Sequence, residues 1–373
     1  MKNITVEISI LLVFFCVGCN SQKNKDYNLS GAIEINLNTN NLSNFDINQV
    51  ADFHSLIPLE TTAESLIGDI TKLFIIDSLI IIYDKKTNAI LVFDDRGNYK
   101  HKIGRPGNGP GEYVRILDVF LDEERNMIQL SDGMLKRIKT YSINGDFLSS
   151  TIVLDYPFVS FYPLDNGYWA VIHYQNSSRD NLVLMDENFN VQKKWFSFTK
   201  KLPLVHINHF IEDREHGILF HDPYDNILYK LDEKNVNPYI LFTFDNEKIS
   251  KENIDNQSPF LSSPLFLNAY IHNGKLFFKF SKPQNKGGFM IYNCFLDLND
   301  LQQHVVFKFY ENFSKEIPVA PLPDLLSVSD GKLVFQIAPH LFPESAFDNL
   351  KGSSLEGINS ESNPVLVLYT LHN

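Results

Sequence analysis

The chain has 373 residues and a formal net charge of −12 at pH 7. Such an acidic chain is a poor candidate for binding nucleic acid, because affinity for phosphate backbones depends on basic side chains that release counterions. Hydrophobic residues make up 44% of the sequence and aromatic residues 13%, with Phe and Tyr far outnumbering Trp. This composition supports a packed core and favours β-strands. The length also suits a single closed β architecture.

The first nineteen residues have the pattern of a lipoprotein signal. The apolar run 8–18 is too short for a membrane-spanning helix, which needs about 20 residues, but has the length of a signal-peptide core. Val17-Gly18-Cys19 resembles a lipobox, although Cys16 stands where Leu is usual. We therefore predict a signal peptide over residues 1–18 and lipidation of Cys19. Simple secretion and an uncleaved anchor are the alternatives.

A polar stretch, NSQKNKDYN, follows the cysteine and is typical of a tether. We assign residues 19–49 to the lipidated cysteine and its tether, and residues 50–373 to the folded domain. Acyl chains anchor a protein without a helix, so membrane contact is expected through the lipid only. Beyond the signal and the lipid site only Cys294 remains, which excludes an intramolecular disulfide and suits a buried apolar position.

An internal repeat runs along the rest of the chain. Five hydrophobic pairs are each followed by an acidic or polar turn, and the last turn residues are spaced 48, 43, 47 and 65 residues apart. These turn residues are Gly97, Gly145, Asn188, Asn235 and Asp300. Gly, Asn and Asp tolerate the positive φ that tight hairpins need. In the first unit, four short β-prone runs surround the turn, at residues 73–76, 79–83, 89–93 and 99–103.

A four-stranded unit of roughly 40 to 50 residues is typical of a propeller blade. We predict an all-β fold, a six-bladed β-propeller with four-stranded antiparallel blades. Residues 53–60 precede the first full blade, and we expect them to close the ring as an N-terminal strand beside residues 364–370. Pro58 would then lie on the sheet edge. The predicted blades are 66–113, 114–155, 156–204, 205–247, 262–312 and 320–371.

The connection over residues 104–113 (GRPGNGPGEY) contains four glycines and two prolines. It resembles the G-x-G-P-G-E-[YF] signature of the six-bladed β-propeller lipoproteins of Bacteroidetes, a family related to NHL-repeat propellers. The resemblance covers most of residues 50–371 and implies a binding or scaffolding lipoprotein of the cell envelope. It implies no defined reaction. Acidic residues directly after the lipidated cysteine favour surface export in such lipoproteins, and their absence here slightly favours a periplasm-facing location over the cell surface.

Two interpretations of this connection stay open. In one, the glycines and prolines set a fixed irregular path between blades, with Gly109 and Gly111 at positive φ. In the other, a ligand at the channel mouth contacts four polar side chains, namely Arg105, Asn108, Glu112 and Tyr113. A phosphate-cradling loop is disfavoured, because a strand follows instead of a helix and two prolines lack an N–H.

Metal and acid–base chemistry have weaker support. Four histidines and an aspartate fall within seventeen residues, but nothing in their spacing makes them converge, so we predict no metal site and no cofactor. These are His206, His209, His216, His221 and Asp222. Several carboxylates could line the channel as an acid–base pair, but the sequence cannot set the required separation of about 5 to 9 Å. They are Glu112, Asp118, Asp122, Asp132, Asp165 and Asp222.

The sequence thus favours an envelope-anchored binding or scaffolding module for a glycan, a peptide or a partner protein. An aromatic-rich segment of the third predicted blade would serve blade packing or, if exposed, sugar binding. It comprises Tyr156, Phe158, Phe161, Tyr162, Tyr168, Trp169 and Tyr174. The alternative function is a hydrolase or lyase acting on carbohydrate or lactone in the channel, including metal-dependent forms. No nucleophile elbow or HExxH motif supports it, so enzymatic activity stays undecided from sequence.

Overall fold

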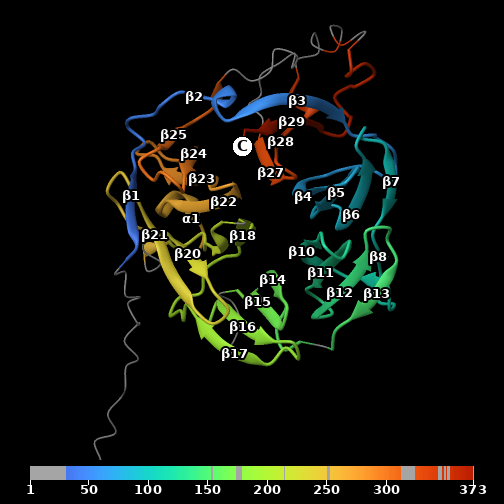
Figure 1. Ribbon diagram of the computed structural model, residues 1–373, viewed down its shortest axis with the longest axis horizontal. Coiled ribbons are helices and arrows are strands. Elements are labelled where there is room, and N and C mark those ends of the chain that lie inside the picture. The colour runs from blue at the N-terminus through green and yellow to red at the C-terminus, as the bar shows by residue number, and fades with distance from the viewer. Residues whose placement is uncertain are drawn as a thin grey trace, which may run out of the picture.

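Six small antiparallel sheets stand in a ring around a central axis (Figure 1). The computed structural model describes residues 31–152, 154–173, 179–213, 215–249, 253–311, 324–342, 347, 350 and 353–372. The predicted six-bladed propeller with four-stranded blades is confirmed. The signal peptide and Cys19 lie outside the described residues. Within them, no helix is long and apolar enough to cross a membrane.

The blades follow one another along the chain, each with its first strand nearest the axis (Figure 1). Blade 1 has β4 (Ile70–Ile76), β5 (Leu79–Asp84), β6 (Ala89–Asp94) and β7 (Tyr99–Lys102). Blade 2 has β10 (Ile116–Asp122), β11 (Met127–Asp132), β12 (Arg137–Ser142) and β13 (Phe147–Ser150). Blade 3 has β14 (Ser160–Leu164), β15 (Gly167–Val171), β16 (Leu182–Asp186) and β17 (Val191–Trp195).

The second half of the ring repeats this order. Blade 4 has β18 (Phe210–Asp213), β19 (Gly217–Phe220), β20 (Ile227–Leu231) and β21 (Val236–Phe244). Blade 5 has β22 (Leu265–His272), β23 (Lys275–Pro283), β24 (Phe289–Asp297) and β25 (His304–Phe307). Blade 6 has β27 (Asp324–Ser329), β28 (Lys332–Ile337), β29 (Val365–Leu371) and β3 (Ala51–Pro58). Short elements are β2 (Phe45–Asp46), β8 (Arg105–Pro106), β9 (Glu112–Tyr113), β26 (Tyr310–Glu311), α1 (Pro259–Ser262) and the 3₁₀ turns η1 (Ile47–Gln49) and η3 (Pro339–Leu341).

Antiparallel blades give the ring two distinct faces. The first two strands of a blade, and its last two, are joined by turns on one face, which we call the hairpin face. The second and third strands turn on the opposite face, where the chain also passes to the next blade; we call it the connection face. Several of the repeated turns found in the sequence are outer turns of the hairpin face, with positive φ at Gly97 (87°) and Gly145 (94°). In blade 3 the positive φ falls on Phe189 instead of the expected Asn188.

The hydrophobic core lies between neighbouring blades. One cluster joins blades 1 and 2, and another joins blades 4 and 5. β5 is buried on both faces along almost its whole length, because its Leu-Ile-Ile-Ile run packs against a blade on either side. Phe158, Phe161 and Trp169 of the aromatic-rich segment are also buried, whereas Tyr174 lies outside the described residues. Cys294 is a buried free thiol.

The N-terminal part of the chain closes the ring. β3 pairs antiparallel with β29, and Pro58, opposite Val365, lies on the outer edge strand as predicted. Asn363 then locks blade 6 onto the start of blade 1. Its Nδ2 donates to the carbonyls of Glu60 (2.8 Å) and Ser65 (2.9 Å), and its Oδ1 accepts from the amide of Ile67 (2.9 Å).

The folded part begins earlier than the predicted boundary at residue 50. β1 (Ile33–Leu37) pairs in parallel with β21 and adds a fifth strand to the outer edge of blade 4. β2 and η1 also fall within the range that the sequence assigned to the tether. The physical reason is the alternating Ile33-Glu-Ile-Asn-Leu37 pattern, which buries Ile35 and Leu37 in the core between blades 4 and 5.

Candidate functional site at the channel mouth

The glycine-rich connection lies at the outer rim of the connection face, between blades 1 and 2 (Figure 1). Its ends pair as the short parallel strands β8 and β9. Glu112 closes the loop with both carboxylate oxygens: Oε1 accepts from Arg105 Nε at 2.8 Å and Oε2 from the amide of Gly109 at 2.9 Å. These donors, the Gly109 amide first, lower the pKa of Glu112.

A buried lysine of blade 2 stabilises the loop by donating hydrogen bonds to its backbone. Lys139 of β12 donates to the carbonyls of Gly109 (3.4 Å), Pro110 (3.3 Å) and Glu112. Burial, the largest cause, lowers the pKa of Lys139. The next residue of the connection, Tyr113, is fully buried in the core between blades 1 and 2. The loop is therefore held both by its internal hydrogen bonds and by contacts with blade 2 and the core between blades 1 and 2.

The structure of this connection corrects three expectations. Tyr113 does not face a ligand, because its ring packs inside the core, and the loop does not lie at the channel mouth. Positive φ falls on Gly104 (66°) and Gly107 (154°), not on Gly109 or Gly111. Arg105 and Asn108 remain exposed. Beside them is an open groove of about 340 Å³, lined by Lys102, Gly104, Arg105, Gly109, Pro110, Gly111, Glu112 and Gly145.

The carboxylates that the sequence suggested for acid–base work are mostly structural. Asp132 is fully buried at the end of β11 and accepts from the amides of Val114, Arg115, Met134 and Leu135. Asp118 bonds Lys72 at 2.6 Å and the amide of Phe161 at 3.0 Å, which links the inner strands of blades 1, 2 and 3. Asp122 pairs with Arg125 on the surface, and Asp165 is exposed.

Blade 1 repeats the Asp132 arrangement with a residue that the sequence did not suggest. Asp84, buried at the end of β5, accepts from the amides of Gly68, Asp69, Lys86 and Thr87. Each of these two carboxylates binds the turn that follows its strand and the segment that enters the blade. Asp84 thereby fixes the backbone around Lys85. Asp132 fixes the backbone of Arg115, whose amide donates to Oδ1 of Asp132 at 3.4 Å.

Three basic residues lie on the connection face, at or leading into strands of blades 1, 2 and 4, and we call them the basic mouth. Lys85 follows β5, Arg115 precedes β10, and His206 lies in the connection from blade 3 to blade 4. Burial and the nearby charges of Lys85 and Arg115 lower the pKa of His206 to about 4. The pKa of Lys85 is lowered first by burial and also by Arg115. These three side chains thus lie within electrostatic reach of one another.

These basic groups are not neutralised by direct contacts. Among the residues that the structure describes, the ammonium of Lys85, the guanidinium of Arg115 and the imidazole of His206 make no hydrogen bond or ion pair. The carboxylates in electrostatic range are Asp118, which is already bound to Lys72, and Asp69, which is exposed. The mouth therefore presents an ammonium, a guanidinium and an imidazole that is uncharged at neutral pH, all without a direct partner among the described residues.

Two other histidines of the cluster, His209 and His221, lie side by side in the interior. His209 bonds the carbonyl of His221 through Nδ1 (2.9 Å), and the two rings lie 6.3 Å apart. Burial is the main cause that lowers the pKa of both, that of His221 to about 3. Asp222 accepts from Asn181 and from the amide of Tyr224. A cavity of about 10 Å³ beside His173, Asn181 and His209 is close to the size of one water molecule.

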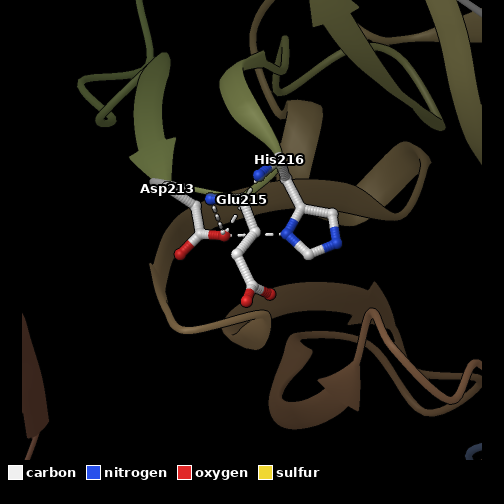
Figure 2. A group of neighbouring side chains, drawn as sticks. All are labelled: Asp213, Glu215 and His216. Carbon is white, nitrogen blue, oxygen red and sulfur yellow. Dashed lines mark hydrogen bonds and ion pairs between the residues drawn. The ribbon is translucent and has the colours of Figure 1, made fainter.

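A different group has donor atoms close enough for a metal ion. Figure 2 shows Asp213, Glu215 and His216 in the turn between β18 and β19, on the hairpin face, with donor atoms within 4.8 Å of one another. Asp213 accepts from His216 Nδ1 (2.7 Å), from the amides of Glu215 and His216, and from the amide of Gly274 in blade 5. Burial alone would raise the pKa of Asp213, but these bonds lower it. The carboxylate thus stabilises the turn and ties blade 4 to blade 5.

Sequence reasoning named His206 of the basic mouth but missed Lys85 and Arg115. Both stand next to the ends of predicted strands, Lys85 directly after Asp84 and Arg115 two residues after Tyr113. Only the arrangement of the blades in a ring brings them near His206, which is more than 90 residues further along the chain. Basic residues at those strand ends that lie on the connection face would have been a useful signal for this site.

Six blades in a ring, each built on four antiparallel strands, and an N-terminal closing strand define this protein as a six-bladed β-propeller. The family model described as "Domain of unknown function (DUF4934)" matches residues 31–370, and the chain belongs to this family. The comparison with curated proteins finds no match.

Two solved structures have similar folds. A candidate exported protein from Bacteroides fragilis NCTC 9343 has 16% identity and a TM-score of 0.69, over 91% of this chain and 100% of that one. A member of the DUF4221 family from Bacteroides vulgatus ATCC 8482 has 7% identity and a TM-score of 0.53, over 87% and 98%. The predicted resemblance to Bacteroidetes propellers is confirmed, while the relation to NHL repeats stays a prediction.

Proposed function

We propose that this propeller is an envelope-anchored binding module that holds an anionic group of its ligand at the basic mouth. The observation that carries the proposal is that Lys85, Arg115 and His206 lie on one face of the ring, within electrostatic reach of one another and with no hydrogen-bond or ion-pair partner among the described residues. A carboxylate, sulfate or phosphate would accept hydrogen bonds from all three, and charge-assisted bonds of this kind are the strong ones. A glycan or a peptide could carry such a group.

The framework beneath the mouth favours binding, because it fixes the backbone that carries two of the basic groups before a ligand arrives. The buried carboxylates of Asp84 and Asp132 fix the backbone that carries Lys85 and Arg115. Such preorganisation reduces the free-energy cost of ordering the site on binding. The alternative of a channel hydrolase or lyase gains no support here, since the buried carboxylates suggested for it already accept hydrogen bonds from neighbouring groups.

The course of the N-terminal segment suggests how the mouth is presented. β1 runs parallel to β21 and so leads toward the connection face, which places Gly31 and Ala32 on the side of the hairpin face. A lipid anchor that holds the membrane near Gly31 would leave the mouth pointing away from it. The candidate exported status of the Bacteroides fragilis neighbour is consistent with an envelope location. The polar residues after Cys19 slightly favour a periplasm-facing anchor.

The test is a binding screen of the soluble domain, residues 28–373, against glucuronate, galacturonate, sulfated glycans, phosphate and their neutral counterparts. We expect an anionic member to bind, and the double variant Lys85→Gln/Arg115→Gln to weaken that binding at least tenfold. The matched control is Arg96→Gln/Lys100→Gln, which removes the same charge at exposed positions away from the mouth. Equal loss in both double variants, or binding of neutral members only, would contradict the proposal.

A further inference from the structure

The β23–β24 hairpin of blade 5 extends beyond its neighbouring strands on the connection face. β23 and β24 pair over nine positions, from Lys275 with Asp297 to Pro283 with Phe289. On one side β22 reaches only as far as Ser281, and on the other β25 reaches only as far as Asn293. The last part of the hairpin is therefore a two-stranded ribbon with two edges that the rest of the blade does not cover.

The register shows which peptide groups face these edges. The amide of Gln284 donates to the carbonyl of Gly288 across the turn, and hydrogen-bonded pairs alternate along an antiparallel ladder. The peptide groups of Phe289 and Ile291 therefore point away from β23, toward the side where β25 has ended. On the opposite edge the corresponding position is Pro283, which has no N–H. One edge is thus partly closed by proline, and the other is open.

The side chains along the open edge are apolar and exposed. Phe289, Met290 and Ile291 keep 46%, 36% and 44% of their surface accessible. The Phe260 ring of α1 lies 5.0 Å from that of Phe289 and widens the apolar surface there. Outer edge strands elsewhere carry lysines, such as Lys100 of β7 and Lys193 of β17, a common protection against strand pairing. The open edge of β24 lacks this protection.

The molecule already uses strand addition one blade away. β1 covers the outer edge of β21 through five residue pairs, which satisfies backbone groups that a propeller blade otherwise leaves at its rim. This internal case shows that a short extended segment with alternating apolar residues fits a blade edge of this ring.

We infer that the open edge of β24 docks an extended segment of another polypeptide, which adds a strand beside residues 289–291. A polypeptide is the occupant that the geometry fits, because it supplies donors and acceptors at the spacing of the unpaired peptide groups. Apolar side chains at alternate positions of that segment would pack on Phe289 and Ile291. This surface is separate from the basic mouth, and the inference does not depend on the anionic ligand.

Selection from a library of random twelve-residue peptides displayed on phage tests the inference directly. We expect the soluble domain to enrich sequences with alternating apolar residues that bind with micromolar Kd. Ile291→Pro removes an outward N–H without removing a hydrogen bond to β23, and should weaken binding at least tenfold. Ile291→Lys keeps the N–H but charges the edge, and serves as the second variant if the proline disturbs the fold. Ile291→Thr keeps the backbone and strand propensity, and should weaken binding less than the proline.

Three results would overturn the inference. One is the enrichment of no peptide, and a second is equal binding of the selected peptides to Ile291→Pro and wild type. The third is that the surface binds another occupant, either a second copy of the chain or a lipid surface. A second copy would appear as self-association in sedimentation, and a lipid surface as flotation of the lipid-free domain with phosphatidylethanolamine and phosphatidylglycerol vesicles. In either case the variant Ile291→Lys would abolish the effect.

Discussion

Gly104 begins the glycine-rich connection, and replacing it with alanine should destabilise the fold through two separate effects. Its φ of 66° lies in the left-handed region, where an L-residue costs about 1–2 kcal/mol. A Cβ would also lie 2.9 Å from Cε1 of Tyr113 and 3.2 Å from Cε1 of Tyr141. Both rings are fully buried, so the clash adds roughly 1–3 kcal/mol of overpacking. The smaller entropy of the unfolded alanine chain offsets about 0.4–1 kcal/mol.

The net expectation for Gly104→Ala is a loss of about 2–4 kcal/mol in the free energy of unfolding, measured by urea denaturation. Gly287→Ala is the matched control, since Gly287 has a φ of 85° but nothing within 4 Å of a new Cβ. It should lose only about 0–1.6 kcal/mol, the cost of the backbone conformation less the same entropy offset. If Gly104→Ala is no less stable than Gly287→Ala, the packing of the connection against the two tyrosines is not what holds it.

Two further predictions concern pH and anchoring. Burial is the largest cause that lowers the pKa of His221 to about 3 and that of His206 to about 4. Below the ordinary histidine pKa of about 6.5, the unfolded chain therefore binds more protons than the folded one. Folding stability should then fall as the pH is lowered from about 6.5 toward 4. A thermal midpoint that is independent of pH between 7 and 4.5 would contradict this. Cys19 should incorporate an alkyne fatty acid in growing cells, and equal labelling of Cys19→Ala would refute the lipid anchor.

The fold could be predicted because its signals are local and repeated. Turn residues such as Gly97 and Gly145 mark the outer hairpins, and the spare strand at residues 53–60 had no partner other than the last blade. β1 was missed because Ile33-Glu-Ile-Asn-Leu37 alternates over only five residues next to a polar stretch. Its burial comes from blade 4, and no local feature of the sequence indicates that contact.

The site was harder to predict because the roles of its residues depend on long-range contacts. Asp132 and Asp118 have the residue type of catalytic carboxylates, yet backbone amides and Lys72 already occupy their oxygens. Lys85 and Arg115 look like ordinary surface residues in the sequence. Only the arrangement of blades 1 and 2 beside the segment that carries His206 makes them part of one basic surface.

The central claim is that the mouth formed by Lys85, Arg115 and His206 binds an anionic group. Isothermal titration of the soluble domain with the best anionic ligand of the screen, at two salt concentrations, tests it most directly. The account predicts that affinity falls as salt rises in the wild type, and that Lys85→Gln/Arg115→Gln loses at least tenfold in affinity with its fold intact. Affinity that is unchanged in this variant and indifferent to salt would contradict the claim.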